Sequence, residues 1–161
     1  MTEKLNVHAT GLVLNGTGLL LRGPAGSGKS LRALSLLDEW EMRGLPGTLV
    51  SDDRVDLALE AGVVVMTPPR PIEGLIELRG RGLVTRPFAR KAPLHLVVDM
   101  VESLERMPED CEFETGLMGV RLARCPVPKD GVTDARHQLL LVREGLRRLS
   151  PGNRPFGQQL T

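Results

Sequence analysis

The chain has 161 residues, of which 41% are hydrophobic, and this length and composition suit one globular domain with a buried core. Its 21 lysines and arginines nearly balance its 20 aspartates and glutamates, and only 2% of its residues are aromatic, which disfavours a nucleic-acid partner. We expect a cytoplasmic protein without a membrane partner, because no secretory signal and no apolar run of roughly 18 residues is present.

The first predicted elements surround a glycine-rich loop. Apolar runs at Leu12–Leu14 and Leu19–Leu21 flank the hairpin signal Asn15-Gly16-Thr17-Gly18. The second strand leads into the loop, and apolar residues at helical spacing then predict a helix over Lys29–Arg43. A short β-type run at Thr48–Ser51 closes a strand, helix, strand unit.

The remainder of the chain predicts short strands and a terminal helix. The strands are Arg54–Glu60, Gly62–Thr67, Leu75–Arg79, Leu83–Arg86, Leu94–Asp99 and Val120–Arg124. The helix spans Thr133–Leu149, with Thr133-Asp134 as its cap. We therefore expect an α/β fold, a single domain over residues 1–150 with a central mixed sheet, hairpins and flanking helices, and a mobile tail over 151–161.

The segment GPAGSGKS has the GxxxxGK[ST] pattern of a phosphate-binding P-loop, with the required strand before it and helix after it. Backbone N–H groups and the helix N-terminus attract phosphate, Lys29 neutralises it, and the Ser30 hydroxyl ligates magnesium. The pattern predicts a P-loop kinase-like domain that binds a nucleotide with magnesium and transfers a phosphoryl group, and we expect the cofactors to be ATP and Mg²⁺. Its nucleotide-binding residues are Gly23, Pro24, Ala25, Gly26, Ser27, Gly28, Lys29 and Ser30.

Two adjacent aspartates, Asp52 and Asp53, follow the strand after the P-loop helix. Ligands of such sheets gather at the carboxyl ends of the strands, so these side chains should lie near the phosphates. Adjacent side chains of an extended strand point to opposite sides, so we expect one carboxylate to be functional and the other structural or linked to the metal. A solvated turn before Arg54 is the alternative interpretation.

Hairpin register brings His8 toward the P-loop. If Asn15-Gly16 is the two-residue loop, His8 faces Gly23, and if Gly16-Thr17 is the loop, it faces Ala25. A surface histidine without a role is the alternative.

Two further carboxylates are candidates. Glu77 alternates with apolar neighbours in a predicted strand, a pattern that a solvent-facing strand explains equally well. Asp99 ends the run LHLVVD, which has the form of a strand carrying a magnesium-associated aspartate. It is therefore the alternative to Asp53 as the functional aspartate.

Together these residues make the chain resemble the catalytic domain of HPr kinase/phosphorylase, the bacterial enzyme that acts on a serine of the phosphocarrier protein HPr. His8 precedes the P-loop at the family's spacing, and GPAGSGKS matches its P-loop. SDDRV at Ser51–Val55 resembles the family's ADDRV, and ELRGRG at Glu77–Gly82 resembles its EIRGLG signature. The likeness covers about Val7–Asp99 well and weakens afterwards.

The resemblance implies roles for individual residues. Asp53 would be the general base toward the acceptor serine, and in the reverse reaction the acid. Lys29 would stabilise the transferring phosphoryl group, Ser30 and Glu77 would hold magnesium, and His8 would assist. Arg106 resembles the arginine of the family's YDR segment. The resemblance further implies HPr as partner and a homo-oligomer, a hexamer.

The chain departs from the family pattern in three places. The resemblance implies a short form without the family's usual N-terminal domain, as in some alphaproteobacteria. Pro126–Gly131 only distantly resembles the family's PVRPGRN loop, which is associated with dephosphorylation by phosphorolysis. Arg81 replaces the usual leucine of the signature.

Three functions are consistent with these observations. The first is a magnesium-dependent protein-serine kinase acting on HPr. The second is a small-molecule kinase or general P-loop NTPase that uses Asp99. The third is a non-catalytic ATP-sensing regulator that controls a partner through the basic segment from Arg70 to Lys91.

Overall fold

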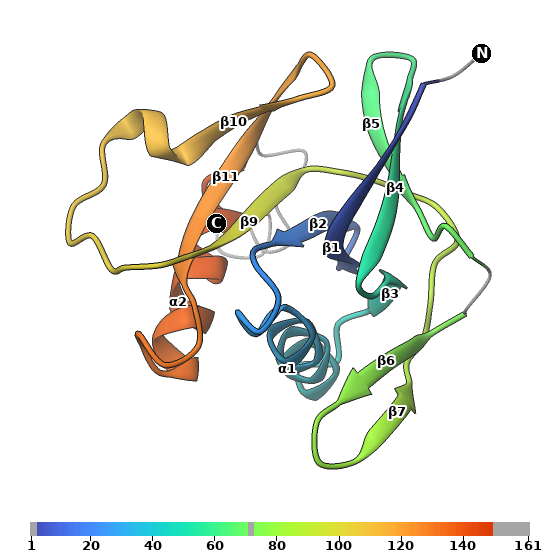
Figure 1. Ribbon diagram of the computed structural model, residues 1–161, viewed down its shortest axis with the longest axis horizontal. Coiled ribbons are helices and arrows are strands. Elements are labelled where there is room, and N and C mark those ends of the chain that lie inside the picture. Colours follow the sequence, from blue (N-terminus) through green and yellow to red (C-terminus); the bar gives the residue numbers. More distant parts are fainter. Residues whose placement is uncertain (1–2, 71–72, 150–161) are drawn as a thin grey trace.

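The computed structural model describes residues 3–70 and 73–149, and the predicted tail over 151–161 lies outside the described residues. Figure 1 shows a curved sheet with helices beside it. In chain order, the elements are β1 (Lys4–Leu14), β2 (Thr17–Arg22), α1 (Lys29–Met42), β3 (Gly47–Ser51), β4 (Arg54–Glu60), β5 (Val63–Thr67), β6 (Leu75–Leu78), β7 (Gly82–Thr85), β8 (Ala92–Pro93), β9 (Leu96–Val101), the 3₁₀ turn η1 (Asp110–Phe113), β10 (Glu114–Leu117), β11 (Val120–Pro128) and α2 (Ala135–Arg147).

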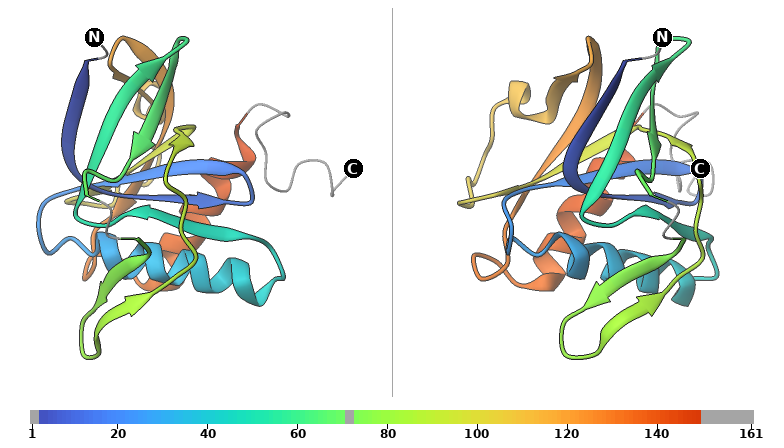
Figure 2. Two further views of the ribbon diagram at one scale, coloured as in Figure 1. Left: turned by 90° about the vertical axis from the view of Figure 1, so that its right-hand side faces the viewer. Right: turned by 45° about the vertical axis from the view of Figure 1, so that its right-hand side comes forward.

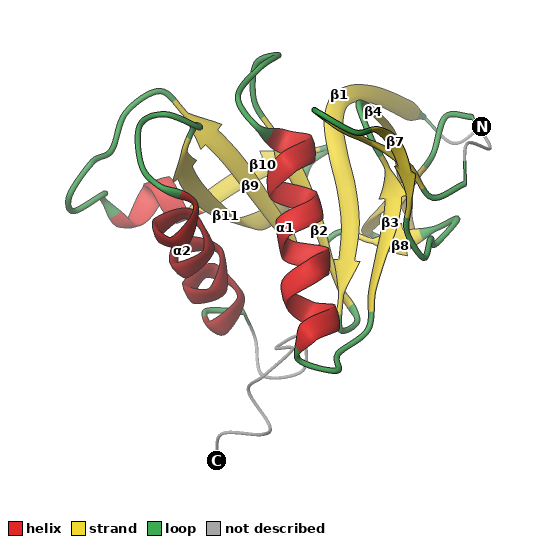
Figure 3. Cartoon of the chain, turned by 90° about the horizontal axis from the view of Figure 1, so that it is seen from below, coloured by secondary structure: helices red, strands yellow, loops and turns green. Residues whose placement is uncertain are grey.

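The central sheet is mixed, which confirms the predicted α/β class. Its strand order is β10-β11-β9-β2-β1-β4-β5-β8, and β3 also pairs with β1. The pairs β2–β9 and β9–β11 are parallel, whereas β1 is antiparallel to all its neighbours. Both helices cover the same face of this sheet (Figure 3). The β6–β7 hairpin forms a separate small sheet beside α1 (Figure 2).

The hairpin of β1 and β2 has the register of an Asn15-Gly16 loop, since Leu14 pairs with Thr17. Asn15 and Gly16 both have positive φ, 47° and 84°, as a two-residue turn of this kind requires. The ladder extends only to the pair Ala9–Arg22, so His8 does not pair with Gly23 as predicted. It pairs with Arg54 of β4 instead, because the chain turns away at Gly23 while β4 occupies the other edge of β1.

The crossover from β2 through α1 to β3 positions the site. Both strands are antiparallel to β1, which lies between them, so they run in the same direction. The P-loop follows β2, and Asp52 and Asp53 follow β3. The two segments therefore meet at one edge of the sheet, as the sequence predicts.

Two apolar clusters hold the sheet and helices together. The larger lies between the sheet and both helices and includes Trp40, which is fully buried. The smaller lies on the opposite face of the sheet and includes Leu57 and Met66. Burying a large apolar side chain contributes roughly 1.5–3 kcal/mol, so the leucines and Trp40 of α1 fix this helix, and with it the end of the P-loop.

The short elements β8, β10 and η1 were absent from the predicted set, and β11 continues beyond its predicted end through two prolines to Pro128. Proline is usually excluded from strand interiors, which explains the missed extension. Neither helix in the described ranges has the length and apolar character needed to cross a membrane.

Candidate active site

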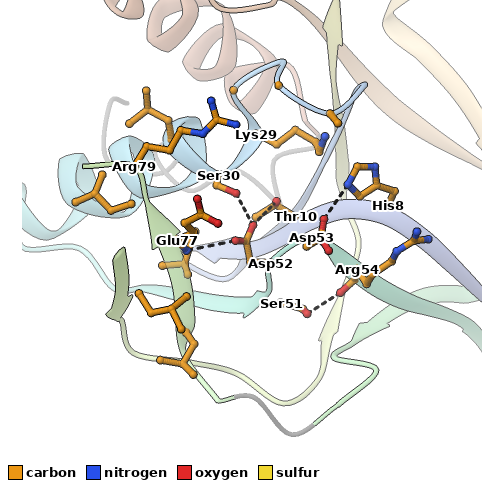
Figure 4. Close-up of a pocket in the computed structure, with 18 of the residues that line it drawn as sticks. His8, Thr10, Lys29, Ser30, Ser51, Asp52, Asp53, Arg54, Glu77 and Arg79 are labelled. Carbon is orange, nitrogen blue, oxygen red and sulfur yellow. Dashed lines mark hydrogen bonds and ion pairs between the residues drawn. The ribbon is translucent and has the colours of Figure 1, made fainter. Parts of the chain in front are cut away.

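A cleft of about 980 Å³ lies at the edge where the P-loop and the β3–β4 junction meet, a volume typical of ligand sites. Strand β1, α1, the β3–β4 junction and the β6–β7 hairpin all contribute to its walls (Figure 4). The predicted residues His8, Lys29, Ser30, Asp53 and Glu77 all line it. The fold thus brings together residues that are far apart in the chain.

The P-loop presents an open helix N-terminus to the cleft. Gly28 is the N-cap of α1, with φ 102°, and no side chain caps the helix. The first turn of α1 also contains no acidic residue. The first N–H groups of a helix have no partner within the helix, and together with the helix dipole they attract an anion, so these residues fit the phosphates of a nucleotide.

Lys29 extends back over the P-loop. Its Nζ donates hydrogen bonds to the carbonyl oxygens of Gly23, at 2.7 Å, and Pro24, at 3.1 Å. Burial lowers the pKa of Lys29, and the charges of Asp53 and Asp52 oppose this effect. An ammonium held by its own loop near two carboxylates is well placed to neutralise phosphate.

Asp52 is the centre of a small oxygen cluster. Its Oδ1 accepts hydrogen bonds from the hydroxyls of Ser30, at 2.7 Å, and Thr10, at 2.9 Å. Its Oδ2 lies 3.5 Å from the backbone nitrogen of Glu77. Thr10 was missed by the sequence reasoning, although it shares one strand face with His8 by period-two alternation.

Asp53 forms a pair with His8 in the same cleft. Asp53 Oδ1 lies 2.8 Å from His8 Nε2, and because an ionised carboxylate only accepts, His8 is the donor. The Asp53 side chain remains largely exposed, at 73%, and is accessible to a substrate.

The expectation that Asp52 and Asp53 diverge was wrong, because both carboxylates line the cleft. Segments β3 and β4 pair with successive parts of β1, and the two aspartates form the irregular corner between them. Asp53 adopts a left-handed conformation there, with φ 69°, which breaks the strand alternation on which the expectation relied.

Oxygen atoms suited to ligate magnesium lie beside the P-loop. Among residues 3–70 and 73–149, no cluster of three or more His, Cys, Asp or Glu side chains is arranged to hold a metal. Such a cage is unnecessary for Mg²⁺, which is usually bound through one or two carboxylates together with substrate phosphates and water. The Ser30 hydroxyl and the Asp52 carboxylate therefore fit this ion, and Glu77 lies on the same wall.

Asp99, the alternative candidate to Asp53, is bound by two arginines, Arg22 and Arg124. Arg22 binds it through two hydrogen bonds, at 2.8 and 2.9 Å, and Arg124 adds a third at 2.6 Å. Burial would raise its pKa, but these hydrogen bonds and charges outweigh burial, so the pKa of Asp99 is lowered. It is absent from the described residues that line the cleft.

Arg106 lies in the exposed loop between β9 and η1. It is not among the cleft-lining residues of the described chain, so this fold does not bring it to the other predicted site residues. Its role stays a prediction.

Comparison with known proteins supports the resemblance. The profile of the HPr Serine kinase C-terminal domain family matches residues 1–131. The chain belongs to this family. An HPr kinase/phosphorylase of Clostridium novyi is 30% identical over 140 residues, covering 80% of this chain and 43% of the relative. One from Bordetella pertussis is 34% identical over 115 residues, covering 63% and 35%.

The fold is shared with a solved structure of the family. The Hpr(Ser) kinase/phosphatase from Coxiella burnetii superposes with a TM-score of 0.68 at 25% sequence identity. The match covers 87% of this chain and 89% of that chain. The chain spans less than half the length of the curated relatives named above.

Proposed function

We propose that this chain is an ATP- and magnesium-dependent protein kinase that phosphorylates a serine of HPr. The observation that carries the proposal is the convergence of an open, uncapped P-loop helix with the His8–Asp53 pair in one cleft. Membership of the HPr kinase family supports the choice of acceptor.

Each site residue has a distinct task in this proposal. When bound, ATP supplies the phosphoryl group. Asp53 accepts the proton of the serine hydroxyl as its oxygen displaces the nucleotide at phosphorus, and His8 orients the carboxylate. Lys29 and the helix N-terminus neutralise charge on the transferring group, which suits a loose transition state. Ser30 and Asp52 would hold Mg²⁺, with Glu77 beside them.

The rim of the cleft supports a protein acceptor over a metabolite. Leu31 on α1 and Leu83 on β7 are exposed, at 47% and 70%, and both line the cleft together with Arg79. Exposed apolar side chains grouped around an arginine are typical of protein docking surfaces. A small metabolite would need no such surface outside the phosphate site.

Family resemblance alone extends the proposal to phosphorolysis, hexamer formation and a cytoplasmic location. Because the loop around Asp130 departs from the family's PVRPGRN, we propose the kinase direction as the primary one. Light scattering after size-exclusion chromatography tests the hexamer.

The proposal is tested by incubating the chain with ATP, Mg²⁺ and HPr and measuring phosphoserine on HPr by mass spectrometry. The expected result is a single phosphoserine that disappears when Mg²⁺ is chelated or when the acceptor serine of HPr is replaced by alanine. Tight ATP binding without phosphoserine would instead support an ATP-sensing regulator and would overturn the kinase proposal.

A further inference from the structure

Asp130, in the loop between β11 and α2, lies directly against the P-loop. Its backbone nitrogen donates a hydrogen bond to the carbonyl oxygen of Ser27 at 3.1 Å. Its carboxylate packs on Gly28 so closely that any side chain at position 28 would collide with it. Asp130 also lines the cleft. A distant segment therefore places a negative charge at the helix N-terminus, where α1 itself has none.

Arg32 lies beneath this carboxylate. It is 3% exposed, and its Nη2 is 3.8 Å from Asp130 Oδ1. Within the described residues, its buried Nε has no hydrogen-bond partner. The loose ion pair indicates that Arg32 acts on Asp130 chiefly through its charge, since no close hydrogen bond joins the two groups.

Gln138 of α2 fixes the carboxylate from the other side. Its Nε2 donates to Asp130 Oδ1 at 3.1 Å and to the carbonyl oxygen of Pro128 at 2.8 Å. Gln138 is 1% exposed, so the position of Asp130 is set by buried contacts and not by a mobile surface loop. The carboxylate thus remains beside Gly28.

This arrangement is unfavourable for phosphate unless the carboxylate is neutralised. A carboxylate beside the P-loop repels an incoming phosphate, whereas the guanidinium 3.8 Å from that carboxylate attracts it. Partial burial strengthens both effects, because water screens them less than it screens exposed charges. With both residues present, each charge offsets part of the other's effect on a phosphate at the P-loop.

We propose that Arg32 and Asp130 form a charge-compensated pair that sets the affinity of the P-loop for nucleotide phosphates. Asp130 lowers the affinity, and Arg32 offsets that loss from beneath the loop. The inference rests on the proposed function only in requiring that the P-loop binds a nucleotide. It assigns neither residue to the phosphoryl transfer itself.

The test is the dissociation constant of Mg·ATP, measured by calorimetry for the whole chain and three variants. Arg32→Met should weaken binding about tenfold, because Asp130 is left uncompensated. Asp130→Asn should tighten binding about threefold to tenfold, although it lowers Tm because buried Arg32 loses its counter-charge. The double variant should return to within about threefold of the wild type.

Glu39→Gln and Arg43→Met are matched controls. They make the same charge changes in an ion pair of 2.9 Å at the other end of α1. At about 1.5 Å per residue, this pair lies beyond the Debye length of about 8 Å from the P-loop. Both controls should leave the dissociation constant unchanged. High salt should reduce the changes in dissociation constant that Arg32→Met and Asp130→Asn cause.

A purely structural role would give a different pattern. The inference would be overturned if both single variants changed the dissociation constant of Mg·ATP in the same direction. It would also be overturned if those changes were no larger than the changes in the controls. If Asp130→Asn does not fold, Arg32→Met and the double variant decide, because methionine replaces a buried arginine with similar volume and no charge. A wild type that binds no Mg·ATP would overturn the proposed function itself, whereas binding with unshifted variants overturns only the charge pair.

Discussion

The Nε2 atom of His8 lies 2.8 Å from Oδ1 of Asp53, although the two residues are 45 positions apart in the chain. The contact exists because β4 pairs with the start of β1, next to the corner at which Asp53 leaves regular strand geometry. In the proposed function, Asp53 of this pair accepts the proton of the serine hydroxyl and His8 orients its carboxylate.

His8→Ala should therefore lower the rate of phosphoserine formation by about 10²-fold, the lower range for a general acid–base contribution. The KM for ATP should change little, because His8 contacts Asp53 and not the P-loop. Steady-state kinetics with both substrates checks this. A variant with unchanged kcat and a raised KM for ATP would assign His8 to nucleotide binding instead.

Asp52→Asn should weaken Mg²⁺-dependent binding of ATP by about tenfold or more, because Asp52 arranges the Ser30 hydroxyl. Binding of ATP without the metal should change much less. Asp56→Asn on β4 is a matched control, since Asp56 is also hydrogen-bonded but lies outside the described lining of the cleft. Equal losses with and without Mg²⁺ would contradict a metal-linked role for Asp52.

Leu83→Gln should raise the KM for HPr by about threefold to thirtyfold while leaving ATP affinity unchanged, because an exposed apolar side chain at the rim contributes only to docking. Leu59→Gln, at a 40% exposed leucine on β4, is the control. No change in KM for HPr would place protein docking away from the β6–β7 hairpin.

Asp99 predicts a pH dependence of stability. Because its pKa in the folded state is lowered below the ordinary value of 3.8, it stabilises the fold above that value, and the contribution is lost as pH falls through the folded-state pKa. Asp99→Asn should lose roughly 2 kcal/mol at pH 7, where Arg22 loses its carboxylate partner and Arg124 keeps only Glu112. Urea unfolding between pH 7 and pH 3 should show a smaller acid loss for the variant. If the free energy of unfolding fell equally with pH in the wild type and in Asp99→Asn, Asp99 would not be the source of this pH dependence.

The two cysteines should differ in reactivity. Burial raises the pKa of the Cys125 thiol to about 12, and Cys111 is exposed. At neutral pH, iodoacetamide should modify Cys111 alone in the native protein and both residues after unfolding. Mass spectrometry of digested protein distinguishes the two sites. Native modification of Cys125 would show that α2 separates readily from β11.

Local signals predicted much of the fold. The Asn15-Gly16-Thr17-Gly18 signal predicted the first hairpin with two alternative registers, and apolar periodicity located α1 to within one residue of its observed end. Most of the strands were also found, with shifted ends. These features depend on neighbours in sequence, which is why composition and spacing predict them.

The site was only partly predictable, because its geometry depends on long-range pairing. Alternation could not anticipate that the left-handed conformation of Asp53 turns both aspartates into one cleft. Thr10 carries no motif of its own, and Asp130 lies in a segment that only distantly resembles a family loop. They reach the P-loop region through sheet register and through the β11–α2 loop. Arg106 is the opposite case, because its segment resembles a family motif but it is not among the described residues that line the cleft.

The central claim is that Asp53 serves phosphoryl transfer to a protein serine. The most direct measurement compares phosphoserine formation on HPr by the wild type, Asp53→Asn and Asp99→Asn under identical ATP and Mg²⁺, with ATP affinity measured for each. We predict that Asp53→Asn binds ATP normally and forms no phosphoserine, whereas folded Asp99→Asn stays active. Full activity of Asp53→Asn together with an inactive, folded Asp99→Asn would contradict it.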